Sequence, residues 1–413
     1  MGELQVEVEP RDVGIDAARV SRLPAYLDGL VEAGRMPGWQ VALSRGGQLV
    51  YVGIGGFRHV EQALPVEPDT IWRIYSMTKP VTSVAAMVLW EEGAFELSDP
   101  VSAFIPSFAD VRVYAGGSDL KPLTVPAQEP IRISHLLTHT SGLTYGFHRV
   151  HPSDALLRAA GYEWSFPPGV TLARAVDAWA SVPLLFEPGA EWNYSLATDV
   201  LGRVVEVLSG MPLDRFFAER ILEPLGMTDT SFGIAARDPA DADRLARLYA
   251  ATPNRRLVPA DAVGASFTRP ATLFSGGGGL VSTAHDYHRF LLMLRGGGAL
   301  DGVRVLGPRT VAAMTRNHLP GGADLEAFGR QLFAESAFDG IGFGLGFSVV
   351  LDPAAGKVPS SAGELAWGGA ASTAFYVDAA EDLGVLFLTQ LLPSSAHPIR
   401  PQLRQLVAQA LVD

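Results

Sequence analysis

Ser76 and Lys79 lie three residues apart at the start of an apolar segment. Apolar residues then recur at helical spacing: Val81, Val84, Ala85, Val88 and Leu89. Serine is a favoured N-cap and Pro80 is tolerated in a first turn, so the pattern predicts a helix that begins at or just after Ser76. Residues at i and i+3 share one helix face, which brings the hydroxyl and the amine into contact.

Such a pair is suited to nucleophilic attack on a carbonyl group. A serine hydroxyl needs a base to take its proton, and a lysine whose pKa is lowered by burial can share that work. The partly positive helix N-terminus favours the oxyanion that forms. Ser118 and Lys121 have the same spacing, but their glycine- and proline-rich surroundings predict a solvated turn. Ser76 is therefore the predicted nucleophile; an N-cap serine beside a surface lysine is the alternative.

Two further segments could supply the other groups that this chemistry needs. Tyr194 lies just before an apolar helix, and a tyrosinate stabilised by an ammonium group can take and return the serine proton. Trp367-Gly368-Gly369-Ala370 ends a predicted strand with two glycines, which let a ligand approach strand-edge N–H groups that bind an oxyanion. The alternatives are an ordinary half-buried aromatic for Tyr194 and a bulge or strand-end turn for the glycines.

Histidines offer a rival chemistry, because His135 and His139 have the i, i+4 spacing of some zinc ligands. No glutamate follows His135, as the zinc peptidase motif requires, so structural roles are favoured and no metal or cofactor is predicted. The sequence has no G-x-S-x-G elbow and no phosphate-binding glycine motif. Gly276 to Gly279 are expected to form a mobile loop.

The composition is that of a globular protein and narrows the possible partners. The chain has 413 residues, 48% hydrophobic and 18% charged, which is enough for a large core. A formal charge of −12 argues against nucleic acid, and no basic amphipathic helix or long apolar run points to a membrane. Cysteine is absent, which excludes disulfides and thiol chemistry. The acidic N-terminus lacks a signal-peptide pattern, so a cytoplasmic location is expected; the oligomeric state is left open.

The flanking patterns predict an α/β (α+β) fold with an antiparallel sheet flanked by helices. A helix over about 17–33 precedes a hairpin with strands at 39–44 and 49–53, and an extended segment at 71–75 leads to Ser76. Later strands are expected at 344–351, 363–367, 373–377 and 383–389, and helices at 283–294 and 401–411. Residues 1–96 and 273–413 are expected to form this α/β domain.

Residues 97–272 are predicted to form a mainly helical subdomain that makes the wall of a cleft. Its expected helices are at 134–138, 172–181, 196–209 and 213–222. Long loops are expected at 114–130 and 148–170, where proline and glycine are frequent.

Three motifs in order make the chain resemble a family VIII carboxylesterase: Ser76-Met77-Thr78-Lys79, Tyr194-Ser195-Leu196 and Trp367-Gly368-Gly369. Those enzymes share the class C β-lactamase and penicillin-binding-protein fold. The segments 135–143 and 188–194 are similar to that family as well, so the resemblance covers most of the chain from about residue 36 to 390.

The resemblance implies that Ser76 is the acylated nucleophile, with Lys79 and Tyr194 as its proton-transfer partners. It also implies an oxyanion hole made by the backbone N–H groups of Ser76 and Ala370, beside the substrate-binding segment Trp367-Gly368-Gly369. Whether Lys79 or Tyr194 is the first base is left open, since the two can titrate as a unit.

Two departures from β-lactamases bear on the substrate. Their tyrosine motif ends in asparagine where this chain has Leu196, and their strand motif is Lys-Thr-Gly where this chain has Trp367-Gly368-Gly369. An amide for a polar group and a charge for a carboxylate are thus missing. The prediction is a serine carboxylesterase acting on neutral, short-to-medium acyl esters; amide or lactam hydrolysis, acyl transfer to an alcohol and a non-catalytic scaffold are the alternatives.

Overall fold

An eight-stranded sheet forms the centre of the computed structural model, which describes residues 2–235, 237–330 and 338–412. In spatial order its strands are β13 (Ile341–Phe343), β14 (Ser348–Val350), β15 (Leu365–Gly368), β16 (Ala374–Asp378), β17 (Leu383–Leu388), β1 (Gly38–Arg45), β2 (Gln48–His59) and β3 (Leu64–Pro65). All neighbouring strands are antiparallel. The hairpin joins the late strands because β1 pairs with β17, Gln40 lying opposite Leu388, so the predicted antiparallel sheet is confirmed.

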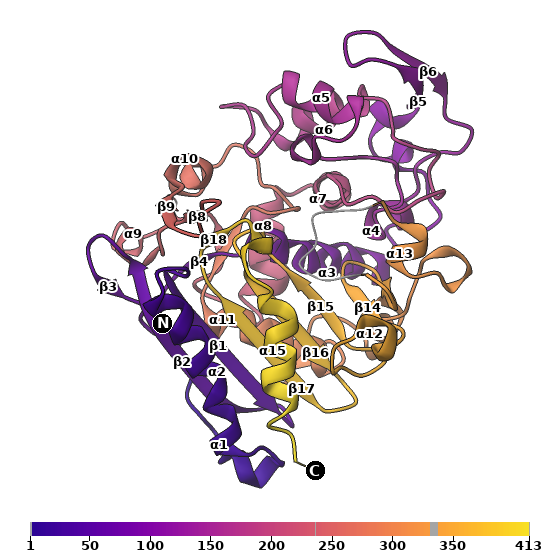
Figure 1. The fold of residues 1–413 in the computed structure, drawn as a ribbon. Helices are drawn as coiled ribbons and strands as arrows, with labels where there is room; N and C mark the ends of the chain where they lie inside the picture. Colours follow the sequence, from indigo (N-terminus) through magenta and orange to yellow (C-terminus); the bar gives the residue numbers. More distant parts are fainter. Residues whose placement is uncertain (1, 236, 331–337, 413) are drawn as a thin grey trace.

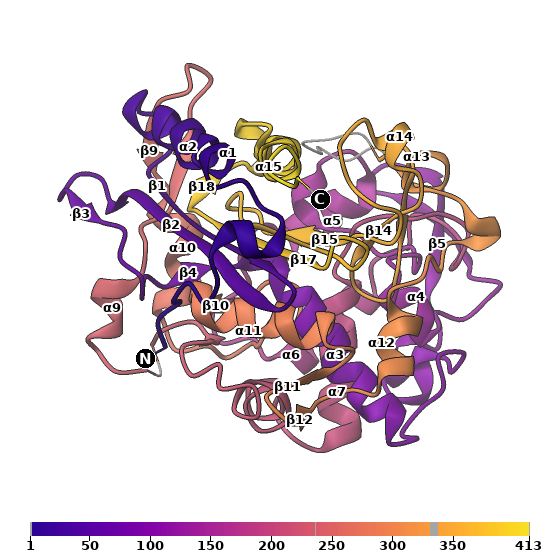
Figure 2. The same cartoon turned by 90° about the horizontal axis from the view of Figure 1, so that it is seen from below.

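Helices cover both faces of this sheet (Figures 1 and 2). Val385 and Phe387 of β17 share a core with α1 (Ala17–Val20), α2 (Arg22–Glu32) and α15 (Ile399–Ala408). The alternate residues Leu386 and Leu388 share the opposite core with α3 (Thr78–Glu91) and α11 (Ala284–Arg295). The helix predicted over 17–33 is divided at Ser21, whose hydroxyl donates to the carbonyl of Ala18.

The helix after the predicted nucleophile is buried from Thr78 to Leu89. It begins two residues after Ser76, as expected, but Ser76 is not its N-cap. Tyr75–Met77 form a 3₁₀ turn, Met77 takes the N-cap position, and no side chain caps the helix. The expectation of a capping serine is therefore wrong, and the Ser76 hydroxyl is not engaged with the helix backbone.

A three-stranded sheet holds the segment that leads to Ser76. It consists of β4 (Trp72–Arg73), β10 (Leu280–Ser282) and β7 (Ser231–Phe232), with β10 in the middle. The N–H of Ile74 also donates to the carbonyl of Leu280 at 3.1 Å. The chain before Ser76 and the chain after the glycine run are thereby fixed side by side.

The helices predicted in the middle of the chain are present. They are α4 (Ile133–Leu137), α6 (Leu172–Ala180), α7 (Ala197–Ser209) and α8 (Leu213–Phe217), which continues as a π-helical turn over Ala218–Leu222. In the views of Figures 1 and 2, α7 lies near α3. The division into an α/β domain and a helical subdomain over 97–272 remains a prediction, and residues 1, 236, 331–337 and 413 within those ranges lie outside the described residues.

Two segments expected to be loops contain regular structure. Residues 114–130 lie largely in a hairpin of β5 (Arg112–Gly117) and β6 (Pro122–Pro126), whose strands alternate in exposure. Residues 148–170 contain α5 (Pro152–Ala159), which has proline at its first position and a capping box formed by His151 and Asp154. Frequent proline and glycine led to the prediction of loops in both segments. The same residues also begin helices and form hairpin turns, which is how they are used here.

The remaining elements are short. They are α9 (Asp241–Arg244), β8 (Tyr249–Ala251), β9 (Leu257–Pro259), α10 (Asp261–Gly264), β11 (Ala299–Leu300), β12 (Val303–Arg304), α12 (Pro308–Met314), α13 (Leu325–Phe328), α14 (Pro353–Gly356) and β18 (Leu391–Leu392). In the described part of the chain, every helix falls short of the length and apolar character that crossing a membrane requires.

Candidate active site

Ser76 lies in the turn between β4 and α3, after a residue with unusual backbone geometry. Tyr75 has a φ of 43°, in the left-handed region that a side chain disfavours. Its ring packs edge-on against Phe267 with the ring centroids 5.2 Å apart, and the N–H of Met77 donates to the carbonyl of Ile74 at 3.0 Å. These contacts hold a strained turn, and strained turns are common where a side chain must be presented to a ligand.

Lys79 is 1% exposed and makes contact with three oxygen atoms. Its Nζ donates to Ser76 Oγ at 3.3 Å, to the Tyr145 hydroxyl at 2.9 Å and to the Gly277 carbonyl at 2.7 Å. An ammonium group has three protons, so these acceptors satisfy it completely. The predicted contact between the Ser76 hydroxyl and the Lys79 amine is thus present.

Tyr194 comes close to Lys79 through its ring, whose centroid lies 4.5 Å from Lys79 Nζ. The ring also contacts Trp367, with the centroids 5.5 Å apart, and the imidazole of His139 at 4.9 Å. A cation over an aromatic face is attracted to it. Lys79 therefore lies against both Ser76 and Tyr194, although these residues are far apart in the sequence.

Tyr145 was missed by the sequence analysis, although it contacts Lys79 directly. Burial is the main cause that raises the pKa of its hydroxyl far above the usual value, and the charge of Asp199 acts in the same direction. Tyr145 consequently keeps its proton at neutral pH and serves Lys79 as a hydrogen-bond acceptor. The only sequence signal was its place two residues after the 135–143 segment.

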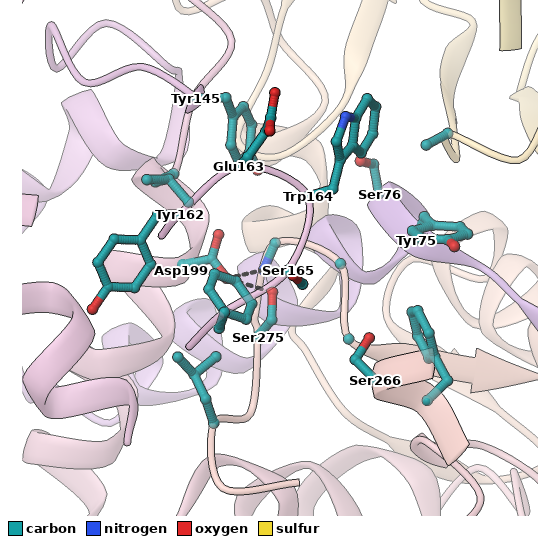
Figure 3. Close-up of a pocket in the computed structure, with 18 of the residues that line it drawn as sticks. Tyr75, Ser76, Tyr145, Tyr162, Glu163, Trp164, Ser165, Asp199, Ser266 and Ser275 are labelled. Carbon is teal, nitrogen blue, oxygen red and sulfur yellow. Dashed lines mark hydrogen bonds between the residues drawn. The ribbon is translucent and has the colours of Figure 1, made fainter. Parts of the chain in front are cut away.

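Asp199 is the second residue that the sequence analysis missed. It is buried on α7 and accepts hydrogen bonds from Ser275 Oγ at 2.5 Å and from the N–H of Gly277 at 3.0 Å (Figure 3). Burial raises the pKa of its carboxyl group, while the ammonium of Lys79 opposes that rise. A charged residue on the apolar stripe of a predicted helix, directly before Val200 and Leu201, was the signal that could have revealed it.

The glycine run after Ser275 belongs to this buried network, so the expectation of a mobile loop is wrong. Ser275, Gly276 and Gly277 are buried, and Gly277 links Lys79 to Asp199 through its carbonyl and its N–H. A Cβ atom on Gly277 would lie 2.3 Å from a carboxylate oxygen of Asp199. Glycine is required here for close packing against the site.

The end of β15 approaches the turn that carries Ser76. A Cβ on Gly369 would lie 2.4 Å from the carbonyl oxygen of Ile74, and a Cβ on Gly368 would lie 2.3 Å from Arg400 Nη2. Both glycines therefore serve backbone packing, and their contact with a substrate remains a prediction. Ala370 borders the same cavity as Ser76. Within the described residues, neither the N–H of Ser76 nor that of Ala370 donates a hydrogen bond.

Ser76 opens into a cleft of about 940 Å³, measured out to its open mouth (Figure 3). Eight aromatic residues line it: Tyr75, Tyr145, Phe147, Tyr162, Trp164, Phe166, Phe232 and Phe267. Tyr145 stacks on Phe147 with the centroids 4.6 Å apart, and Phe147 stacks on Trp164 at 4.5 Å. This stack leads from Lys79 to the cleft mouth, where Trp164 is 48% exposed.

The cleft wall carries little charge. Glu163 and Asp199 are its only carboxylates in the part of the chain that the structure describes, and no arginine or lysine lines it there. Glu163 is paired with Arg149, whose Nε donates to it at 2.8 Å. A wall of this kind favours neutral, apolar ligands.

The two histidines with zinc-like spacing have separate structural roles. The N–H of Arg132 donates to Nδ1 of His135, whereas Nδ1 of His139 lies 3.2 Å from Ser195 Oγ. Burial lowers the pKa of His135 to about 4 and that of His139 well below its usual value, so both are neutral at pH 7. Among the residues that the structure describes, no three histidine or carboxylate side chains form a group that could hold a metal ion.

Comparison with known proteins identifies the family. A sequence model of the Beta-lactamase family matches residues 23–409. The chain belongs to the beta-lactamase family. It is 32% identical over 407 residues to esterase EstB of Burkholderia gladioli, covering 92% of this chain and 93% of EstB.

Solved structures agree with that assignment. EstCE1, described as a hydrolase with promiscuous acyltransferase activity, has a TM-score of 0.78 and 28% identity, covering 95% of this chain and 98% of its own. A family VIII carboxylesterase shares the fold, with a TM-score of 0.70, 20% identity and coverage of 96% and 99%. The resemblance to family VIII carboxylesterases and the predicted β-lactamase-like fold are therefore confirmed.

In this member of the beta-lactamase family, the two departures noted from β-lactamases lie close to the predicted catalytic residues. Leu196 borders the cleft and is 4% exposed. Trp367 packs against the ring of Tyr194 and, with the centroids 5.3 Å apart, against Phe343. Both positions add apolar surface where β-lactamases have an amide and a cation.

Proposed function

We propose that this beta-lactamase-family chain is a serine carboxylesterase that hydrolyses neutral, short-to-medium acyl esters through an acyl-enzyme on Ser76. The observation that carries the proposal is the 3.3 Å contact between the Lys79 ammonium and Ser76 Oγ at the base of an open cleft. The similarity to esterase EstB over nearly the whole chain supports the reaction class.

In the proposed reaction, Ser76 Oγ attacks the ester carbonyl, and its proton passes to the pair formed by Lys79 and Tyr194. The oxyanion accepts hydrogen bonds from the N–H groups of Ser76 and Ala370, and the N-terminus of α3 adds a partial positive charge. The alcohol leaves with the returned proton. Water then attacks the acyl-enzyme by the same route and releases the acid and free Ser76.

Lys79 Nζ lies 4.5 Å from the centroid of the Tyr194 ring, so its ammonium can stabilise a Tyr194 phenolate, the form of Tyr194 that accepts the serine proton. We therefore assign proton transfer to the Lys79–Tyr194 pair as a unit, with Tyr194 the carrier and Lys79 the electrostatic partner. Tyr145, whose pKa is raised by burial, holds Lys79 in place and keeps its own proton.

The proposed substrates are neutral because the described cleft wall has two carboxylates and no cation. A penicillin or cephalosporin carries a carboxylate and would meet no partner there, so lactam hydrolysis is expected to be weak. Acyl transfer to an alcohol is the second candidate. The aromatic wall favours an apolar acceptor over water, and EstCE1 is described as having such activity.

The test is hydrolysis of p-nitrophenyl butyrate by wild type, Ser76→Ala and Ser118→Ala. Ser118 has the same spacing to a lysine but lies in the exposed β5–β6 turn, which makes it a matched control. We expect activity to vanish in Ser76→Ala and to persist in Ser118→Ala. A serine-reactive phosphonate should add one adduct mass to wild type and none to Ser76→Ala. Full activity in Ser76→Ala would refute the mechanism, and a wild type without phosphonate labelling would favour a non-catalytic scaffold.

A further inference from the structure

Arg400 connects the C-terminal helix to the end of β15. This residue lies on α15, which packs on the sheet face opposite α3 (Figure 2). Its Nη2 donates to the carbonyl oxygen of Gly369 at 3.4 Å. The guanidinium also lies against Gly368, because a Cβ there would be 2.3 Å from Nη2 and 2.6 Å from Cζ. The absent side chain at Gly368 is what lets Arg400 reach the strand end.

The carbonyl that Arg400 binds belongs to the same peptide unit as the N–H of Ala370. In a trans peptide the C=O and the N–H point in opposite directions. Arg400 binds the C=O from the α15 side, so the N–H is directed away from α15. Ala370 borders the cleft together with Ser76, so the N–H is directed to the cleft side of this peptide. That N–H makes no hydrogen bond within the described chain.

Other hydrogen bonds of the described residues fix the neighbouring backbone, but none of them involves the Gly369–Ala370 peptide unit, whose carbonyl Arg400 binds. The N–H of Gly369 donates to the carbonyl of Thr373 at 2.9 Å, and the N–H of Leu391 donates to the carbonyl of Ala371 at 3.1 Å. The first bond holds the adjacent Gly368–Gly369 peptide unit, and the second holds the Ala371–Ser372 unit, two units further along the chain. Among the described residues, only Arg400 donates to the Gly369 carbonyl.

We propose that Arg400 is a positioning residue for catalysis, which orients and polarises the Gly369–Ala370 peptide so that its N–H stabilises the oxyanion. A charged donor on the carbonyl strengthens the hydrogen bond that the N–H of the same amide gives. The inference rests on the proposed esterase mechanism and adds a contribution from the far side of the sheet. It also gives Gly368 a role distinct from substrate contact.

The test compares Arg400→Ala, Arg400→Lys and Arg404→Gln in steady-state hydrolysis of p-nitrophenyl butyrate. Losing an oxyanion donor costs about 10²- to 10³-fold in kcat, so misorienting one should cost about 10- to 100-fold. We expect Arg400→Ala to lose kcat by that factor with KM within about twofold, and Arg400→Lys to recover part of the loss. Arg404, one turn further along α15, pairs with buried Glu364, so Arg404→Gln should lower Tm and leave kcat near wild type.

Three results would overturn the inference. An unchanged kcat in Arg400→Ala would remove the positioning role, and a rise in KM alone would make Arg400 a binding residue. Equal kcat losses in Arg400→Ala and Arg404→Gln that follow Tm would make the role one of stability only. Ser76→Ala, measured in parallel, separates the two proposals: if it is inactive while Arg400→Ala is as fast as wild type, only the inference about Arg400 fails; if it is active, the proposed function fails as well.

Discussion

The Lys79 ammonium donates a hydrogen bond to the Tyr145 hydroxyl at 2.9 Å, whereas Tyr194 presents its ring to the same ammonium. Two tyrosines therefore surround one lysine in different ways. Tyr145 accepts a hydrogen bond that fixes the position of Lys79, whereas Tyr194 is the proposed proton carrier. This division of roles can be tested by removing one hydroxyl at a time.

Tyr145→Phe should weaken catalysis less than Tyr194→Phe. A buried hydrogen bond to a charged group contributes about 1.5–3 kcal/mol, so its loss should lower kcat about 10- to 100-fold. Loss of the proton carrier should lower kcat about 10²- to 10⁴-fold. The measurement is kcat for p-nitrophenyl butyrate across pH 6–9. A larger loss of kcat in Tyr145→Phe than in Tyr194→Phe would make Tyr145 the proton carrier and Tyr194 the residue that positions Lys79.

Gly277→Ala should destabilise the protein, whereas Gly278→Ala should not. The added Cβ at Gly277 would lie 2.3 Å from Asp199, while at Gly278 the nearest heavy atom is 3.7 Å away, which is ordinary contact. Overpacking of this kind costs about 1–3 kcal/mol, so Tm should fall by several degrees for Gly277→Ala alone. The measurement is thermal unfolding of both variants. Equal Tm values for the two variants would mean that the backbone around Gly277 shifts to accommodate the added methyl group at little energetic cost.

The sequence predicted the sheet and the Ser76–Lys79 contact because both depend on local patterns. Alternating strands and a three-residue helical spacing are visible without tertiary structure. Asp199 and the Gly276–Gly277 segment could not be placed, because their roles arise from contacts with residues more than seventy positions away.

The wrong expectations share a physical cause as well. The glycine-rich run was expected to be mobile, but a glycine allows a close approach of backbone to a buried carboxylate as readily as it allows flexibility. Ser76 was expected to cap a helix, but a 3₁₀ turn over Tyr75–Met77 puts Met77 at the N-cap position and no side chain caps the helix. Residue type alone therefore does not distinguish a flexible glycine from a closely packed one, or a capping serine from a serine that does not cap.

Trp164→Ala should reduce affinity for esters with bulky apolar groups. Trp164 stacks on Phe147 at the mouth of the cleft and is 48% exposed, so its removal costs little stability but takes away a large contact surface. We expect KM for p-nitrophenyl phenylbutyrate to rise about 5- to 30-fold and KM for p-nitrophenyl acetate to change less than twofold. Leu123→Ala is the control, because Leu123 is 58% exposed on β6 and does not line the cleft. An equal change in KM for the two esters would mean that the acyl group does not bind against Trp164.

Stability should fall as the pH is lowered from 6.5 towards 4, and His288 should contribute to that fall. His288 is buried on α11, and burial, followed by the nearby His285 and Arg289, lowers its pKa to about 4. An unfolded histidine binds a proton near pH 6.5, so between these values the unfolded state holds a proton that the folded state rejects. The stabilisation is complete above pH 6.5 and is lost as the pH falls through 4.

Each pKa unit is equivalent to about 1.4 kcal/mol, so the contribution of His288 is on the order of 3 kcal/mol. His288→Leu removes the titration and also removes a buried Nε2 that has no partner among the described residues. Urea unfolding at pH 7.5, 6 and 5 should therefore show a smaller loss of unfolding free energy in His288→Leu than in wild type. Parallel curves for the two proteins would assign the acid sensitivity to other groups, because a residue that does not titrate differently in the two states cannot change the slope.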